Sequence, residues 1–233
     1  MTSVTTDLVG YVQAALGERA NPGKAAGMQA YMKTDMPFYG VQKPERVKIL
    51  REIKSRFAPG SHSEYLDAAA ALWDLPHREE KYLAQGVAVA FPEHIVPSSL
   101  PLYRRFIVDG AWWDFVDETA THLIRELVLG YPEEIWPIVE GWVRDEDMWL
   151  RRTAILCQVG AKTRTDSDRL FSFCIARAHE SEFFIRKAIG WALREYARTD
   201  PEAVARFVTD HRGELPPLSV REASKHIAHL VGT

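Results

Sequence analysis

Two adjacent indoles precede two carboxylates in the segment from Trp112 to Asp117, WWDFVD. On a helix, Trp113 and Asp117 lie four residues apart and therefore share one face, one turn from each other. A large aromatic surface beside a carboxylate can hold a flat or cationic group and stabilise positive charge that develops during a reaction. The alternative is a buried tryptophan pair beside solvated acids. The choice depends on the elements that present these residues.

Helical patterns account for almost the whole sequence, and no alternating, β-branched pattern typical of strands stands out. Proline and glycine mark most boundaries, and Asp166, Ser181 and Asp200 have the side chains expected of helix N-caps. The predicted helices cover residues 5–19, 22–34, 44–57, 62–74, 77–91, 93–109 (interrupted by two prolines), 112–129, 132–144, 147–161, 167–179, 182–198, 201–212 and 217–231. An all-α protein of antiparallel helices is therefore predicted.

A short pattern of apolar and basic residues recurs every 35 residues in the second half of the chain. The segments LRRTAI at 150–155, IRKAIG at 185–190 and VREA at 220–223 keep one register. Self-similarity at such a period is typical of helical hairpins that stack into a curved solenoid. The sequence thus predicts an array of short, HEAT-like hairpins.

The same register predicts which side chains share a surface. Four equivalent positions, each 35 residues from the next, are Tyr82, Asp117, Arg152 and Lys187. Trp113 lies one helical turn before Asp117, and Trp191 lies one turn after Lys187. We expect these residues on one concave face, because solenoids usually bind along that side. A buried layer of ion pairs is the alternative, in which case Asp117, Arg152 and Lys187 would need partners.

The composition is that of an ordinary globular protein of 233 residues with a formal net charge of −3, so no overall basic field points to nucleic acid. Residues 43–56 and 151–198 are nevertheless locally basic, and such strips can bind phosphates or simply be solvated helix faces. Cys157 and Cys174 are expected to be reduced core residues. With no signal peptide or membrane span in the pattern, the cytoplasm is the expected compartment.

Several motifs taken together resemble the AlkD-like DNA alkylation repair glycosylases, a family built from HEAT-like repeats. The resemblance covers nearly the whole chain, and the motifs occur in the family's order and spacing. They are MQAYMK at 28–33, PFYGV at 37–41, LWDLP at 72–76, WWDFVD at 112–117, WLRR at 149–152 and IGWA at 189–192.

The resemblance implies a single domain over residues 1–233, folded as an α-α superhelix with a concave DNA-binding face. It also implies hydrolysis of the N-glycosidic bond of cationic N3- or N7-alkylated purines, such as 3-methyladenine and 7-methylguanine, in duplex DNA. The family's catalytic carboxylate corresponds to Asp117, and the indoles that pack on the lesion nucleotide correspond to Trp113 and Trp191. Its DNA-contacting arginine and N-terminal tyrosine correspond to Arg152 and Tyr31.

Lys187 joins Arg152 as an expected phosphate contact that sets register without reading base sequence. A monomer is expected, with no metal, cofactor or obligate protein partner. The acidic net charge departs from the basic character expected of such an enzyme. Two alternatives stay open. One is a non-catalytic protein that binds DNA structure on the same scaffold, and the other is a HEAT-type protein-interaction scaffold, which predicts an apolar groove.

Overall fold

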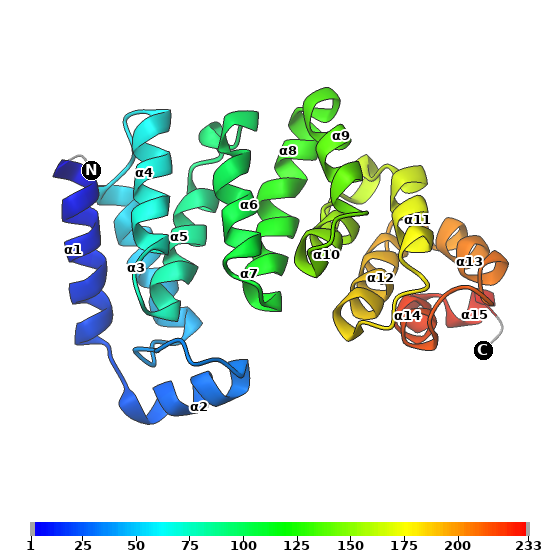
Figure 1. Ribbon diagram of the computed structural model, residues 1–233, viewed down its shortest axis with the longest axis horizontal. Helices are drawn as coiled ribbons and strands as arrows, with labels where there is room; N and C mark the ends of the chain where they lie inside the picture. Colours follow the sequence, from blue (N-terminus) through cyan, green and yellow to red (C-terminus); the bar gives the residue numbers. More distant parts are fainter. Residues whose placement is uncertain (1–2, 232–233) are drawn as a thin grey trace. The chain divides into compact units, whose positions relative to one another are not determined.

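The computed structural model describes residues 3–231, and every regular element in that range is helical (Figure 1). The all-α prediction is therefore confirmed for this part of the chain. Helices close in sequence pack against each other, most extensively α4 on α5 and α12 on α14. The chain divides into two compact units, Met1–Leu102 and Tyr103–Thr233. A single domain over residues 1–233 stays a prediction.

The first unit has a core between four of its helices, which bury Leu8, Ile49, Leu72 and Leu83. Its elements are α1 (Ser3–Glu18), α2 (Pro22–Met32), α3 (Lys43–Arg56), α4 (His62–Trp73), α5 (Arg78–Ala90) and the short 3-10 turns η1 (Pro92–His94) and η2 (Pro97–Ser99). Helix α6 (Leu100–Val108) contains the boundary between the units.

The second unit carries every predicted site residue except Tyr31 and Tyr82. Its elements are α7 (Trp113–Glu118), the π-helical turn η3 (Thr119–Ile124), α8 (Arg125–Gly130), α9 (Pro132–Trp142), α10 (Met148–Leu156), η4 (Lys162–Arg164), α11 (Ser167–Ala176), α12 (Phe183–Tyr196), α13 (Pro201–Asp210), α14 (Pro217–Ala223), η5 (Ser224–His226) and α15 (Ala228–Val231).

The predicted helices agree with these elements to within about five residues at their ends, apart from two details. Residues 93–109 form two 3-10 turns before α6, and the last predicted helix is broken at Ser224. Asp166 and Asp200 accept backbone hydrogen bonds as N-caps, as predicted. The prediction for Ser181 is wrong, because the N-cap of α12 is Glu182 and that side chain makes no capping bond.

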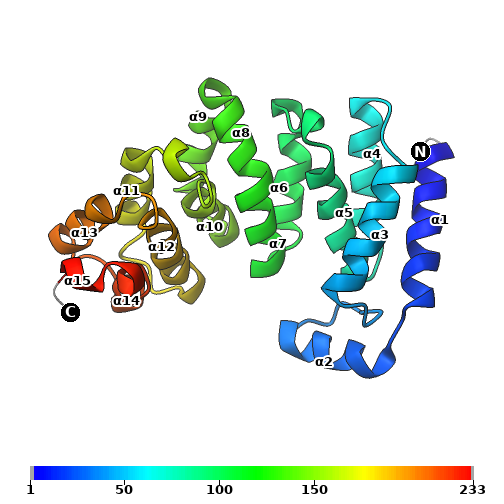
Figure 2. The same cartoon turned by 180° about the vertical axis from the view of Figure 1, so that it is seen from behind.

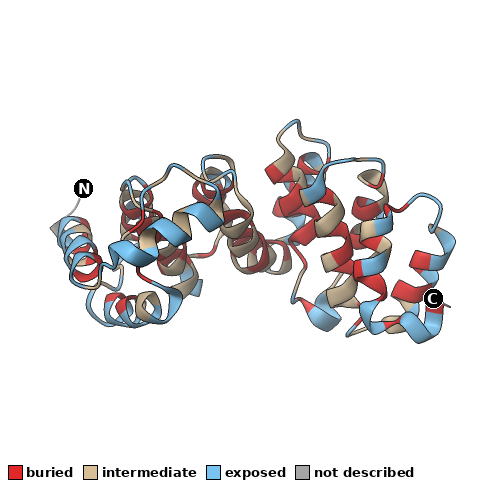
Figure 3. Cartoon of the chain, turned by 90° about the horizontal axis from the view of Figure 1, so that it is seen from below, coloured by how far each residue is buried: buried red, intermediate tan, exposed pale blue. Residues whose placement is uncertain are grey.

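Buried residues line the inner faces of the helices in both units (Figure 3). The apolar periodicity correctly predicts core positions for Trp73, Trp136, Trp142 and Trp149, all of which are buried. Cys157 and Cys174 are free, buried thiols, in agreement with their predicted place in the core. Burial raises the pKa of both thiols well above its ordinary value, so neither is a ready nucleophile.

Helix α2 lies beyond the ends of α1 and α3, roughly crosswise to them (Figure 2). It contributes no buried residue, and contacts at its ends fix its place in the first unit. At its start, the side chain of Asn21 accepts a hydrogen bond from Lys24 N at 3.1 Å, and Asn21 N donates to the carbonyl oxygen of Tyr39 at 2.8 Å. At its end, Lys33 adopts the left-handed conformation that terminates helices.

The loop after α2 is held by one buried carboxylate. Glu79 at the start of α5 accepts hydrogen bonds from the backbone N–H groups of Tyr39, Gly40 and Val41 at 3.1, 2.8 and 2.9 Å. Gly40 has a φ of +85°, and a Cβ atom there would lie 2.1 Å from the carbonyl oxygen of Asn21. The conformation of this loop therefore requires glycine at position 40, because any side chain there would collide with the backbone.

We expect Gly40→Ala to lower the free energy of unfolding by about 2 kcal/mol or more, because alanine is strained at positive φ and collides with backbone. Gly27→Ala is the matched control within α2, where an added Cβ meets nothing within 4 Å. That change should raise stability by about 0.5–1 kcal/mol, because alanine favours the helix. Urea unfolding of both variants measures the difference, and equal stabilities would contradict this account.

Candidate active site

Asp117 and Arg152 form a bidentate ion pair between α7 and α10. Arg152 Nε donates to Asp117 Oδ1 at 2.8 Å and Nη2 donates to Oδ2 at 2.9 Å. The remaining nitrogen, Nη1, donates to the carbonyl oxygen of Phe184. The side chain of Arg152 is 4% exposed and that of Asp117 is 17% exposed. These two charges therefore pair with each other, as the ion-pair alternative requires, while the carboxylate keeps an edge open to solvent.

This engagement bears on the predicted DNA contact of Arg152. Each of its three guanidinium nitrogens already donates within the protein, so the geometry gives a direct phosphate contact no support. What the guanidinium does is fix the orientation of a carboxylate. Each carboxylate oxygen has two lone pairs, and the arginine uses one on each, so Asp117 retains acceptor capacity toward a ligand.

The pKa of the Asp117 carboxyl is raised above its ordinary value. Burial is the largest cause, because it disfavours the charged form. The hydrogen bonds and charge of Arg152 oppose the rise, and the nearby charge of Asp114 adds to it. Arg152 thus limits the rise of this pKa and favours the charged form of the half-buried carboxylate.

A second ion pair lies between α12 and α14, where Lys187 Nζ contacts Glu222 Oε1 at 2.9 Å. Arg194 and Lys225 also contact this carboxylate, which is only 6% exposed. Lys225, the largest cause, and Lys187 lower the pKa of Glu222 from 4.5 to about 2, although burial of the carboxyl opposes this shift. Lys187 remains 38% exposed, so a phosphate can still approach its ammonium group.

Glu222 is a residue that the sequence reasoning missed, although the signal was present. It lies one more step of 35 residues beyond Lys187, in the segment VREA that sets the register. Gly190 allows the close approach of α14, because a Cβ there would lie 2.6 Å from Glu222 Cβ. Equivalent positions of neighbouring hairpins therefore meet twice, as Asp117 with Arg152 and as Lys187 with Glu222.

The two predicted indoles are half-buried rather than sealed in the core. Trp113 lies one turn before Asp117 on α7, and Trp191 lies one turn after Lys187 on α12, packed against the hydrophobic core. Trp112 packs instead against Trp149 and Phe184, with ring centroids 6.1 and 5.5 Å apart. This inner aromatic cluster supports the backbone whose carbonyl holds Arg152.

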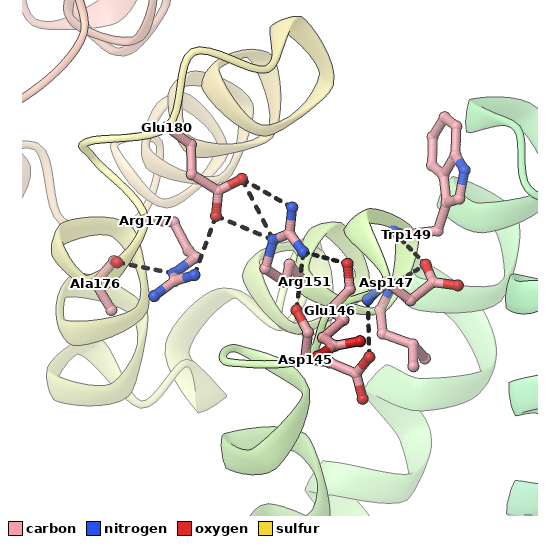
Figure 4. A network of polar contacts seen from close by, with 9 residues as sticks. Asp145, Glu146, Asp147, Trp149, Arg151, Ala176, Arg177 and Glu180 are labelled. Carbon is pink, nitrogen blue, oxygen red and sulfur yellow. Dashed lines mark hydrogen bonds and ion pairs between the residues drawn. The ribbon is translucent and has the colours of Figure 1, made fainter.

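The start of α10 is fixed by a polar network around Arg151, next to the arginine of the ion pair (Figure 4). Arg151 Nη1 donates to the carbonyl oxygens of Asp145 and Glu146, both at 2.8 Å, and its Nε contacts Glu180 Oε1 at 3.0 Å. Asp147 caps the helix by accepting from Trp149 N at 2.7 Å. Arg152 is therefore presented from a helix end with little freedom to move.

The helix that carries Asp117 changes its hydrogen-bonding pattern directly after the carboxylate. One π-helical segment, η3, connects α7 to α8 without ending the helix. Thr121 Oγ1 donates to the carbonyl oxygen of Asp117 at 2.7 Å, and Thr119 Oγ1 donates to that of Phe115 at 2.9 Å. Such segments often occur at functional sites, which is consistent with the candidate role of Asp117. The sequence pattern predicted the helix over 112–129 but not this change.

Tyr31 and Tyr82 belong to the first unit. The side chain of Tyr31 on α2 is 72% exposed, as a surface contact requires. The Tyr82 hydroxyl accepts from Arg78 Nε at 3.1 Å, and Arg46 lies over its ring at 4.4 Å. The roles of Tyr31 and Lys187 toward DNA stay predictions.

Residues 3–231, the part of the chain that the structure describes, lack the features of two other classes of site. No group of three or more histidine, cysteine, aspartate or glutamate side chains is arranged to hold a metal ion there. No helix in that range combines the length and apolar character needed to cross a membrane.

Comparisons with known proteins agree with the motifs. The family model described as DNA alkylation repair enzyme matches residues 12–227. The chain is also similar to a solved structure from Enterococcus faecalis, described as a predicted DNA alkylation repair enzyme, with 31% identity and a TM-score of 0.78. The match covers 90% of this chain and 97% of that one, and supports the predicted class of helical-repeat superhelix. No curated protein matches.

We expect Arg152→Ala to destabilise the protein by about 3 kcal/mol or more, because it leaves the Asp117 charge buried without its partner. Arg105→Ala is the matched control, since Arg105 makes an exposed ion pair with Asp109 at 2.9 Å, also in the second unit. Removal of that pair should cost less than about 1 kcal/mol. Chemical unfolding measures the loss of unfolding free energy in both variants. Equal losses would mean that the buried pair contributes no more to stability than the exposed one.

The lowered pKa of Glu222 predicts the direction of a pH effect. Its ion pairs stabilise the folded state above pH 4.5, and that contribution is lost as the pH falls from 4.5 toward about 2, where the folded carboxylate takes up a proton. The stability gap between wild type and Glu222→Gln should therefore narrow over this range. Unfolding free energies measured at several pH values test this, and a gap independent of pH would contradict it.

Proposed function

This chain belongs to the family of DNA alkylation repair enzymes, and from that premise we propose that it is a DNA glycosylase. It would hydrolyse the N-glycosidic bond of cationic N3- or N7-alkylated purines, such as 3-methyladenine and 7-methylguanine, in duplex DNA. The observation that carries the proposal is a half-buried carboxylate, Asp117, held in one orientation by Arg152 and preceded by an indole one turn away.

Departure of the alkylated base does not require a proton donor from the protein. Alkylation at N3 or N7 places a positive charge on the purine, so the base departs as a neutral molecule without a general acid. The bond breaks with positive charge developing on the deoxyribose, as in glycoside hydrolysis. What the enzyme must supply is negative charge near the sugar and a positioned water.

Asp117 is suited to both tasks. Its free lone pairs can oppose the charge that develops on the sugar and accept a proton from the attacking water. Because Arg152 holds the carboxylate in place, little reorganisation is needed as the charge develops. A carboxylate in a partly dry site acts more strongly than one in water, which is consistent with its 17% exposure.

The remaining predicted residues would hold the substrate. Trp113 and Trp191 would pack on the lesion nucleotide, where an indole face stabilises a developing cation. Lys187, with 38% of its side chain exposed, and Tyr31, with 72%, would contact phosphates and set register without reading sequence. The proposed enzyme acts as a monomer in the cytoplasm, without a metal or cofactor.

We expect Asp117→Asn to reduce release of 7-methylguanine from alkylated duplex DNA by a factor of about 100–1,000 or more, while DNA binding changes little. The amide cannot oppose the developing charge or accept the proton from water. Glu118→Gln is the matched control, because it removes one charge from the next residue, whose side chain is 40% exposed. Quantification of the released base in single-turnover reactions measures the effect.

The raised pKa of Asp117 adds a pH criterion to this test. Excision should fall as the pH drops through a value above the ordinary carboxyl pKa, because only the charged form works. An Asp117→Asn enzyme with full activity would remove this residue from the chemistry. Wild-type protein that binds alkylated DNA but releases no base would favour the non-catalytic DNA-binding alternative, in which the ion pair is purely structural.

A further inference from the structure

We propose that the first unit carries a binding pocket of its own for an unpaired nucleotide, between α2, α3 and α5. The pocket has a volume of about 420 Å³, within the range of small-molecule sites. The family description does not assign this pocket, and Tyr31 alone among its lining residues also has a role in the proposed excision. The proposal does not rest on excision, because binding here can be measured with undamaged DNA.

The charged residues that line the pocket are all basic. Lys24, Lys43 and Arg46 line it, and no acidic residue does, although the whole chain has a net charge of −3. Lys24 Nζ is held by Gln42 Oε1 at 3.0 Å, and Arg46 Nη1 donates to the carbonyl oxygen of Val41 at 2.8 Å. Lys43 is exposed at the first position of α3. An anionic group is therefore the expected occupant of this rim.

The walls of the pocket are aromatic and thioether groups. Phe38 and the ring of Tyr82 lie on the side of the loop and α5, and Met28, Tyr31 and Met32 lie on α2. Arg46 covers one face of the Tyr82 ring and Phe38 is buried, so the exposed ring of Tyr31 is the one on which a base can stack. The methionines adapt to the shape of a flat, polarizable ligand. A flat base next to a phosphate satisfies both the walls and the rim, and a nucleotide combines the two.

Helix α2 is arranged to form this wall rather than a core. None of its residues is buried, and its apolar side chains Met28 and Met32 are only half-buried against the pocket. Its position is nevertheless fixed by the Asn21 bonds, by Gly40 and by the three hydrogen bonds to Glu79. A braced helix with an uncovered apolar side gives a preformed site, which lowers the cost of binding.

Stacking on neighbouring base pairs covers both faces of a base within a duplex, so the nucleotide must be unstacked and therefore unpaired. It can belong to a DNA strand or be free in solution, because both present a base and a phosphate. The probes are a fluorescent short oligothymidylate, the same strand annealed to its complement, and thymidine monophosphate as a competitor. Fluorescence anisotropy measures the affinity of each for the full-length protein.

Two variants alter the pocket without touching a buried residue. Met28→Trp fills it, and Lys43→Glu reverses the charge of its rim. The matched control is Lys54→Glu, the same charge change on α3 at an exposed residue outside the lining. We expect Met28→Trp to weaken single-strand binding by about tenfold or more, because loss of one stacked base costs that much. We expect a similar loss for Lys43→Glu, because a cation at the rim is replaced by an anion that repels the phosphate. Lys54→Glu should cost far less.

The outcomes separate the sources of the nucleotide. Competition by thymidine monophosphate that Met28→Trp abolishes would support a site open to free nucleotides. Binding of the single strand alone, sensitive to both variants, would support a site for a nucleotide within DNA. Single-strand affinities unchanged by Met28→Trp, with Lys43→Glu equal to Lys54→Glu, would overturn the proposal. Thermal melting checks that the variants fold, and Lys24→Glu replaces either one that does not.

Discussion

The bidentate contact between Asp117 and Arg152 is the constraint on which the site in the second unit depends. Removing two charges from water costs several kcal/mol per ion, and the cost is recovered only if geometry and additional hydrogen bonds are good. Here two parallel N–H···O bonds and the Phe184 carbonyl satisfy the guanidinium. The polar network of Arg151 and the aromatic cluster around Trp112 keep α10 and α12 where this geometry holds.

The 35-residue register explains why the ion pairs occur where they do. Equivalent residues of stacked hairpins are neighbours, so a charge at one position is satisfied most directly by an opposite charge one repeat away. The chain has acid, base, base and acid at the four successive positions 117, 152, 187 and 222. The structure pairs the first with the second and the third with the fourth. The repeat thus supplies an opposite charge for each of these positions, and Glu222 has Arg194 and Lys225 as additional partners.

Much of this arrangement can be predicted from the sequence, and the part that cannot has a physical reason. Helix positions follow from apolar periodicity and proline breaks, and the register identifies which side chains become neighbours. Whether Arg152 turns to Asp117 or to solvent is decided by desolvation, which depends on the depth of the surrounding side chains and not on spacing. Likewise the bracing of α2 by Glu79 joins residues about 40 positions apart, and no local pattern reveals it.

The acidic net charge is less of an obstacle to DNA binding than it first appears. Exposed charges act over about 8 Å at physiological salt, so a phosphate responds to the groups near it and not to the sum over the chain. In the second unit Glu222 is surrounded by three cations, which leaves that cluster with excess positive charge around the partly exposed Lys187. In the first unit the pocket beside α2 has basic residues and no acidic ones. Local charge of this kind can attract a polyanion while the protein as a whole stays mildly acidic. The attraction is then confined to the surroundings of Lys187 and to the pocket beside α2.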